Sequence, residues 1–208
     1  DQPGVRLEVN CHVVTAKLAS INNLTHVCEE AGLSVEGFVF EPVASSYATV
    51  LPSERERGVI LMDMGGGTLD IVVIRKGVVV YSTVVSMGGY HVTAEIANVL
   101  KVPDSPTAEL LKRRHGVASA AMAGTEQYET AVPGAREPRL VPQKLLAEII
   151  EFKMEKILQI ARADLESSGF LFDAESVVFT GGCSMLPGVD ALTERVFEMP
   201  ARIGKPAG

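Results

Sequence analysis

Cysteine is scarce in this sequence of 208 residues, which contains three of them and no C-x-x-C pair. An odd number of isolated cysteines (Cys11, Cys28 and Cys183) argues against a disulfide framework and fits the thiols of a reducing cytoplasm. The four histidines show no metal-ligand spacing either. Because zinc sites need clustered ligands, we interpret the cysteines and histidines as structural or surface residues.

Long apolar runs and an excess of basic charge are also missing. No apolar stretch reaches the length of a membrane-spanning helix, and the first residues, Asp1–Gly4, do not resemble a signal peptide. A formal net charge of -7 argues against a nucleic-acid partner. With 47% hydrophobic and 22% charged residues, the composition predicts one large or two small globular domains.

The hydrophobic pattern predicts strands interleaved with helices, and therefore an α/β fold with a mixed sheet. Strands are expected at Val5–Thr15, Val35–Phe40, Gly58–Asp63, Asp70–Lys76, Val78–Met87, Gln127–Val132, Arg139–Pro142, Ser176–Thr180 and Ala201–Ile203. Helices are expected at Lys17–Ala31, Pro42–Val50, Tyr90–Leu100, Thr107–His115, Lys144–Ser168 and Leu186–Met199. We interpret Pro52–Arg57 as a charged turn at a subdomain boundary.

The segment Asp63–Asp70 is the strongest candidate for a functional site. Its turn consists of three consecutive glycines, Gly65, Gly66 and Gly67. Glycines let a ligand approach the backbone, and a row of turn amides can hold a phosphate. Thr68 adds a hydroxyl donor, and the carboxylate of Asp63 can hold a hydrated Mg²⁺. A tight hairpin with no ligand is the alternative, but the flanking aspartate and Thr-x-Asp favour a phosphate site.

A second glycine element follows the expected strand Ser176–Thr180. Gly181 and Gly182 come at the carboxyl end of that strand, where open α/β folds bind ligands. They would let a flat ring or a ribose lie on the main chain, with Met185 packed against the ring. Strand–Gly-Gly–helix turns are also common for packing reasons, so this element alone is weak evidence for a ligand.

Charged side chains complete the candidate set. Glu109 and Lys112 lie three residues apart on one helix face, where they could bond ribose hydroxyls. The aliphatic stem of Lys112 or Arg113 could cover an adenine, although a surface ion pair explains the same spacing. Glu41, at the start of a helix, could orient a water for attack on a γ-phosphate or could cap the helix.

The order and type of these motifs resemble the actin–Hsp70–hexokinase ATPases. Asp63–Asp70 resembles their phosphate-2 hairpin, Val178–Gly188 their adenosine motif and Glu41–Ser46 their first connecting helix. The segment Glu109–Arg113 is similar to the adenosine-contact helix of Hsp70 proteins. The resemblance implies an actin-like ATPase (ribonuclease-H-like) fold, a mixed sheet flanked by helices, with ATP and Mg²⁺ as cofactors.

Within this superfamily the chain most closely resembles the FtsA family, the bacterial actin homologues of cell division. The segments that carry the similarity are Gly4–Val9, His12–Thr15, Ala44–Tyr47, Lys112–Gly116, Leu146–Glu151, Val196–Phe197 and Ala201–Gly204. The first phosphate hairpin, most of the first lobe and the amphipathic membrane-targeting tail of that family have no counterpart here. We therefore interpret the chain as a fragment.

The resemblance also implies a division of the chain. Residues 1–16 would be the last strand of subdomain 1C, and residues 17–57 a remnant of subdomain 1A with the connecting helix. Residues 58–91 and 173–208 would form the nucleotide-binding subdomain 2A. Residues 92–172 would form an inserted, partner-binding subdomain 2B. The apolar residues of Val35–Phe40 should then be exposed, which favours self-association.

A function follows from the resemblance as an expectation. The protein would be cytoplasmic and peripheral to the inner face of the cell membrane, where it polymerises and tethers the FtsZ ring. Hydrolysis of ATP would be slow or absent, with Glu41 or Asp70 positioning the water. Subdomain 2B would bind the acidic C-terminal tail of FtsZ through Glu151 and Lys153. The alternatives are another actin-like assembly protein, of pilus or MreB type, and less closely an Hsp70-like or sugar-kinase ATPase.

Overall fold

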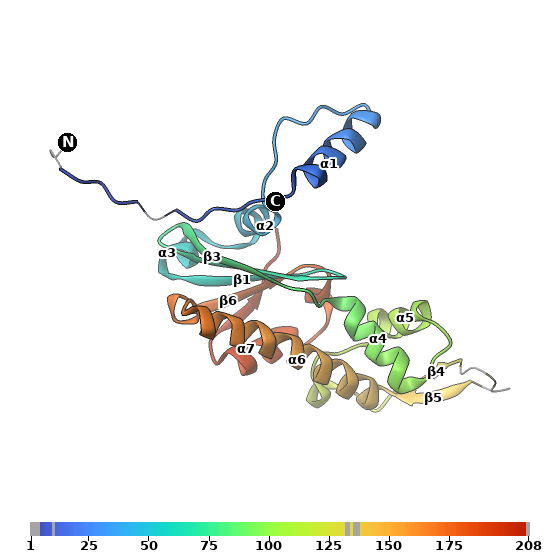
Figure 1. The fold of residues 1–208 in the computed structure, drawn as a ribbon. Coiled ribbons are helices and arrows are strands. Elements are labelled where there is room, and N and C mark those ends of the chain that lie inside the picture. Colours follow the sequence, from blue (N-terminus) through green and yellow to red (C-terminus); the bar gives the residue numbers. More distant parts are fainter. Residues whose placement is uncertain (1–4, 10, 132–133, 135–137, 207–208) are drawn as a thin grey trace.

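A five-stranded mixed sheet forms the centre of the structure (Figure 1). The computed structural model describes residues 5–9, 11–131, 134 and 138–206. The strand order is β3-β2-β1-β6-β7, built from β1 (Val59–Met64), β2 (Leu69–Arg75), β3 (Val78–Val85), β6 (Ser176–Thr180) and β7 (Ala201–Ile203). The strand β2 runs antiparallel to both β1 and β3, whereas β6 runs parallel to β1 and to β7. The predicted mixed sheet is confirmed.

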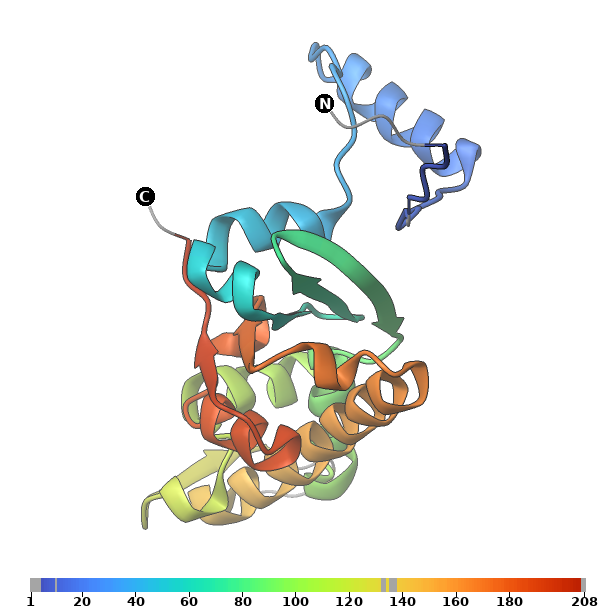
Figure 2. The ribbon, with the colours of Figure 1, turned by 90° about the vertical axis from the view of Figure 1, so that its left-hand side faces the viewer.

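Both faces of this sheet are covered. Successive apolar side chains of β1 point to opposite faces and pack into two hydrophobic clusters, one on each face. Ile60 and Met62 pack into the larger cluster, with residues of α4 (Gly89–Leu100), α6 (Gln143–Ser168) and α7 (Val189–Phe197). Val59 and Leu61 pack into the smaller cluster on the opposite face. That face carries α2 (Glu41–Thr49) and α3 (Pro52–Arg57) (Figure 2). A strand that is covered on both faces is mostly apolar, which explains the continuous apolar run Val59–Met62 of β1 before Asp63.

The helix α6 confirms the expected long helix and connects the sheet to a second group of elements. Its buried residues repeat at intervals of three and four along one side. At its far end lie α4, α5 (Ser105–His115) and the two-stranded sheet of β4 (Gln127–Thr130) and β5 (Arg139–Pro142). Val132, in the expected first strand of this pair, lies outside the described residues. Among the helices of the described ranges, none combines the length and apolar character needed to span a membrane.

Two predicted strands are wrong. Val5–Thr15 and Val35–Phe40 have no regular secondary structure among their described residues. A strand is stabilised by hydrogen bonds to a neighbouring strand, and neither segment is paired in either sheet. Their apolar side chains are accordingly exposed, including Val5, Leu7, Val9, Val13, Phe38 and Val39. The alternating pattern therefore gave the wrong local structure. The expected exposure of Val35–Phe40 is observed at Phe38 and Val39, whereas Phe40 packs against the smaller cluster of the sheet.

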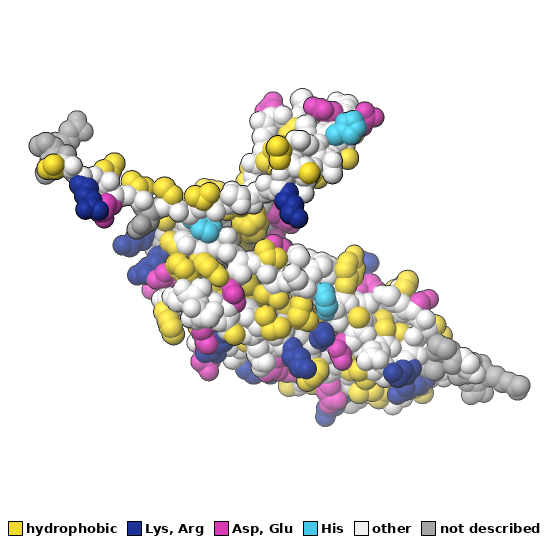
Figure 3. All heavy atoms as spheres, in the orientation of Figure 1, with side chains coloured by type: hydrophobic (Ala, Val, Ile, Leu, Met, Phe, Trp, Pro, Cys, Tyr) yellow, Lys and Arg dark blue, Asp and Glu magenta, His cyan; other side chains and the backbone are white. Residues whose placement is uncertain are grey.

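Most of the N-terminal arm (residues 5–9 and 11–40) projects away from the sheet (Figures 1 and 2). Its contacts with the sheet include a hydrogen bond of 3.0 Å between His12 and Ser82 of β3 and the packing of Phe40 against the smaller cluster. It contains α1 (Leu18–Glu30), which confirms the predicted helix, and none of the residues of α1 is buried. Gly32 has a positive φ of 79° after the helix, as expected for a residue that ends it. Figure 3 shows apolar side chains spread along the arm. The amphipathic pattern of α1 thus predicted a helix correctly. The buried face that such a pattern implies is absent among the residues of α1.

The segment Pro52–Arg57 is the helix α3, not the charged turn that we expected. Pro52 is the first residue of the helix, where its missing N–H is not needed. The carboxylate of Glu54 accepts a hydrogen bond of 2.8 Å from the amide of Leu51, which precedes the helix. A tertiary contact adds to this local stabilisation, because Glu54 is also paired with Arg202.

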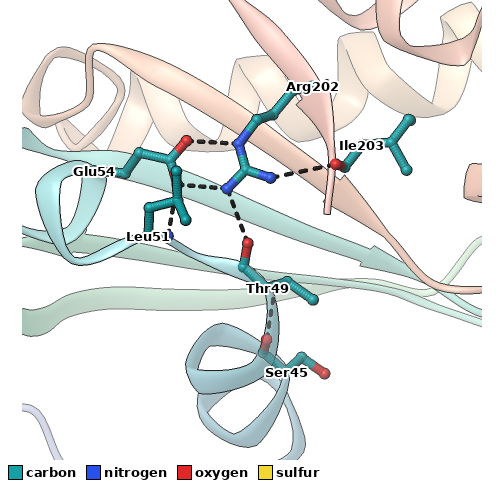
Figure 4. Close-up of polar contacts among 6 residues, drawn as sticks. All are labelled: Ser45, Thr49, Leu51, Glu54, Arg202 and Ile203. Atoms are coloured by element: carbon teal, nitrogen blue, oxygen red, sulfur yellow. Dashed lines mark hydrogen bonds and ion pairs between the residues drawn. The ribbon is translucent and has the colours of Figure 1, made fainter. Parts of the chain in front are cut away.

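The pair of Arg202 and Glu54 connects α3 to the edge strand β7 (Figure 4). Nε and Nη2 of Arg202 each lie 2.6 Å from a carboxylate oxygen of Glu54. Nη2 also donates to the carbonyl of Thr49, at the end of α2, over 2.9 Å. Glu54 is only 9% exposed. This network fastens α2 and α3 to the far edge of the sheet.

Candidate functional site

A cavity of about 560 Å³ lies between the glycine turn after β1, the start of α4, α5 and the 3₁₀ turn η3 (Gly182–Met185). Its volume is within the range of small-molecule sites. Several residues that the sequence predicted as ligand contacts line it: Gly65, Gly66, Glu109, Lys112, Arg113, Gly182 and Met185. These residues come from three distant parts of the chain, so the fold brings together the three motifs that were weak when taken alone.

The glycine turn is held in shape by the first residues of α4. The carbonyl of Gly65 accepts from the amide of Gly89 over 2.9 Å, and the carbonyl of Gly66 accepts from Tyr90 over 2.8 Å. In a planar trans peptide the N–H points opposite to the C=O, so the amides of Gly66 and Gly67 point away from α4.

Neither of these two amides donates a hydrogen bond to any described part of the chain. No atom lies within 4 Å of the position that a Cβ on Gly67 would take, so this side of the turn is open. Two neighbouring amides with no acceptor, on an open glycine turn, can hold an anion.

The second glycine element lines the cavity through Gly182 and also contacts the side chain of Asp63 through Gly181. Gly181 has a φ of 85° and a ψ of -178°, and a Cβ there would lie 2.5 Å from Oδ1 of Asp63. The other carboxylate oxygen, Oδ2, accepts from the hydroxyl of Ser45 over 2.6 Å. Gly181 therefore packs closely against one oxygen of the Asp63 carboxylate, and Ser45 donates a hydrogen bond to the other. Neither Asp63 nor Gly181 lines the cavity.

Lys112 is buried, and its ammonium group points into the structure. Nζ donates to the carbonyl of Gly89 over 2.9 Å and to the hydroxyl of Thr93 over 2.8 Å. It also forms an ion pair of 2.7 Å with Glu109. Burial acts to raise the pKa of Glu109, but the hydrogen bonds from Lys112 and Thr93 outweigh it and hold this pKa below its usual value. The ion pair considered above is therefore present, but its lysine is buried and also braces α5 against the start of α4.

The remaining predicted residues are not among those that line the cavity. The hydroxyl of Thr68 donates to the carboxylate of Asp70 over 2.9 Å, so these two side chains are paired with each other. Glu41 is the first residue of α2 and is exposed. No group of three or more His, Cys, Asp or Glu residues within the described ranges is arranged to hold a metal. The roles predicted for the remaining residues stay proposals: Glu41, Gly67, Thr68 and Asp70.

Tyr90 and Cys183 are among the residues of the cavity wall that were not singled out as ligand contacts from the sequence. Tyr90 packs its ring on the glycine turn, and Cys183 places its thiol 3.8 Å from the carbonyl of Gly65. Burial raises the pKa of the Cys183 thiol. Both residues directly follow a Gly-Gly pair, Gly88-Gly89 or Gly181-Gly182, and this shared position was the available signal.

Comparison with known proteins identifies the family. The family model described as "Cell division protein FtsA" matches residues 60–207. The chain belongs to the FtsA family. It is 36% identical over 206 residues to the FtsA protein of Pseudomonas aeruginosa, which covers 98% of this chain and 49% of that protein. It is also 36% identical over 209 residues to the FtsA protein of Borreliella burgdorferi, covering 99% of this chain and 50% of that protein.

The chain thus spans about half the length of these FtsA relatives. Its structure is similar to the crystal structure of MreB5 of Spiroplasma citri bound to ADP, with a TM-score of 0.77 and 19% sequence identity. That similarity covers 91% of this chain and 61% of the MreB5 chain. It confirms the predicted actin-like ATPase fold. The family match assigns the chain to the cell-division proteins, and not to the MreB or pilus type considered as alternatives.

The two residues proposed to contact a partner are already engaged within this FtsA-family chain. Lys153, on α6, forms an ion pair of 3.1 Å with Glu95 on α4. Glu151 accepts from the amide of Ala120 over 2.7 Å and from Arg195, on α7, over 2.6 Å. Burial acts to raise the pKa of Glu151, but these bonds outweigh it and lower the pKa. Glu151 therefore has a structural role, and a partner at Lys153 would have to compete with Glu95.

Proposed function

We propose that this chain binds an adenine nucleotide, ATP or ADP, in the cavity beside the glycine turn. The observation that carries the proposal is the pair of unused amides at Gly66 and Gly67, next to a cavity of about 560 Å³. The phosphates would lie on the turn, and Glu109 would bond the ribose. The base would lie between Arg113 and Met185, beside the Gly181-Gly182 turn. The MreB5 structure of the same fold, which is described as bound to ADP, supports an adenine nucleotide as the ligand.

Mg²⁺ would bind at Asp63 through water. A single carboxylate held by Ser45 fits this ion, which keeps several waters and takes its other ligands from phosphates. When bound, the ion would neutralise phosphate charge. Glu41 or Asp70 would orient the attacking water if hydrolysis occurs, and the Gly66 and Gly67 amides would stabilise the phosphate charge. The amide of Gly65, which the sequence also suggested for this role, is not available because it donates to the carbonyl of Thr68 over 3.0 Å. We propose slow or no hydrolysis and a mainly structural role.

The cellular role that we propose is that of an actin-like filament protein of cell division. It would assemble with itself and tether the FtsZ ring to the inner face of the cytoplasmic membrane, through a tail outside this chain. The proposed subdomains follow the architecture: all five strands of the main sheet come from residues 58–91 and 173–208. Residues 92–172 supply α5, the small sheet, α6 and most of α4.

The substitution Gly67→Val tests the nucleotide site. A side chain at this position enters open space, so the fold should be unchanged, but the side chain would cover the proposed phosphate position. We expect ADP to bind at least about tenfold more weakly in calorimetry, with the free energy of unfolding within about 0.5 kcal/mol of the wild type. Gly37→Val is the matched control, because it also enters open space but lies on the N-terminal arm. Equal ADP affinity in Gly67→Val and wild type would contradict the proposal.

Binding of an acidic FtsZ tail is tested with the ion pair of Lys153. A peptide of that tail, titrated by fluorescence anisotropy, should bind the wild type and should bind Lys153→Glu about tenfold more weakly. Glu95→Gln removes the intramolecular competitor of the peptide and should strengthen binding. Lys144→Glu, an exposed change elsewhere on α6, controls for the change in net charge. If Glu95→Gln weakens binding or leaves it unchanged, Lys153 is not the contact.

A further inference from the structure

Tyr90 is an aromatic side chain placed against the proposed phosphate position. It is the second residue of α4 and, among the described residues that line the cavity, the only aromatic one. A Cβ on Gly66 would lie 2.8 Å from both Cε2 and Cζ of its ring. Cδ2 of the ring lies 3.3 Å from the same position, so the face of the ring packs on Gly66, near the Cζ atom that carries the phenol hydroxyl.

The backbone holds Tyr90 in this place. Its amide donates to the carbonyl of Gly66 over 2.8 Å, so the residue is attached to the glycine that its ring covers. The contact also requires a glycine at position 66, because any Cβ there would collide with the ring. Gly67, by contrast, has open space around it. Ring and turn therefore form one wall of the site, open on the side of Gly67.

The hydroxyl of Tyr90 has no hydrogen-bond partner in the described part of the chain, and the side chain is 68% exposed. The hydroxyls of Tyr81 and Tyr128 are engaged: Tyr81 donates to Asp164 over 3.1 Å and Tyr128 donates to Glu126 over 2.6 Å. The ring of Tyr47 lies under the guanidinium of Arg55, but its hydroxyl also has no partner among the described residues and lies outside the cavity. Tyr90 thus offers an unused O–H donor on the ring that covers Gly66, whose amide is unused as well.

We propose that Tyr90 contacts the ligand directly: its hydroxyl donates a hydrogen bond to the phosphate held by the Gly66 and Gly67 amides. This inference rests on the proposed nucleotide site and adds a side-chain donor to it. A hydrogen bond to a charged oxygen is stronger than one between neutral groups, so a phosphate benefits more than the base or ribose would. Tyr90 would therefore contribute to the affinity for nucleoside diphosphates and triphosphates, and not for the nucleoside.

The substitution Tyr90→Phe tests this inference because it removes one oxygen and keeps the ring on Gly66. By calorimetry we expect ADP and inorganic pyrophosphate each to bind about tenfold more weakly than to the wild type. Adenosine should bind with unchanged affinity. Tyr47→Phe is the control, because it removes the same atom from an exposed tyrosine outside the cavity.

The outcomes separate this inference from the proposed function. If the wild type binds ADP and Tyr90→Phe binds it equally well or more tightly, the hydroxyl is not a phosphate donor and the inference is wrong. If the wild type binds pyrophosphate but neither ADP nor adenosine, the adenine-nucleotide proposal fails, while a loss of pyrophosphate affinity in Tyr90→Phe would still support the inference. If the wild type binds none of the three, both are overturned.

Discussion

Gly181→Ala is expected to lower the free energy of unfolding by about 4 kcal/mol. The backbone of Gly181, with φ 85° and ψ -178°, is in a region that is essentially restricted to glycine. An added Cβ would also lie 2.5 Å from Oδ1 of Asp63 and 2.6 Å from the carbonyl oxygen of Met64. Both atoms belong to β1, so the clash would push apart the strands that carry the two glycine elements. Urea denaturation followed by circular dichroism measures the loss.

Gly182→Ala is the matched control for this prediction. A Cβ on Gly182 has no atom within 4 Å, and its φ is not positive. We expect a change in the free energy of unfolding within about 0.5 kcal/mol. A similar loss in both variants would mean that the steric argument for Gly181 is wrong. A small effect in both would show that β1 and β6 can move apart at this point without cost.

Arg202→Met is expected to lower the free energy of unfolding by about 3 kcal/mol at pH 7. The substitution leaves the buried carboxylate of Glu54 without its partner, and removes the bond to the carbonyl of Thr49. Removing one partner of a buried pair is costly because the remaining charge is not solvated. The double variant Arg202→Met, Glu54→Leu should recover most of the loss, since it leaves no unpaired charge. A double variant as unstable as the single one would contradict this explanation.

The same pair predicts a dependence on pH. The hydrogen bond from Arg202 is the largest effect on the pKa of Glu54; it outweighs burial, which acts to raise this pKa, and holds it below its ordinary value of 4.5. A carboxylate whose pKa is lower in the folded state stabilises the protein above the unfolded pKa, and this stabilisation is lost as the pH falls through the folded pKa. The difference in unfolding free energy between wild type and Arg202→Met should therefore be largest at neutral pH and shrink below pH 4.5. A difference that does not vary with pH would rule out the ionised pair as its source.

Elements whose structure depends on local pattern were predicted well from the sequence. The periodic apolar residues of α6 and the apolar runs of β1 and β6 gave the correct element at nearly the correct residues. The failures lie where structure depends on a distant partner. Val5–Thr15 alternates like a strand but has no strand beside it, and α3 replaces an expected turn because Glu54 caps it and binds Arg202.

The candidate site divides in the same way. Glycine content and spacing identified Gly65–Gly67 and Gly181-Gly182, because the conformational freedom of glycine is a property of the residue. The direction of the Lys112 ammonium group could not be predicted, since its acceptors Gly89 and Thr93 come from another helix.

The sequence by itself determined the α/β fold class, the glycine turn and, through its resemblance, the FtsA family. Only the tertiary structure decided which backbone groups of the turn remain available. The start of α4 takes the carbonyls of Gly65 and Gly66, and peptide planarity then directs the amides of Gly66 and Gly67 to the open side. The same contact between α4 and the turn places the ring of Tyr90 on Gly66. Local sequence restricts the conformations that are accessible to each residue, whereas contacts between distant segments select among them.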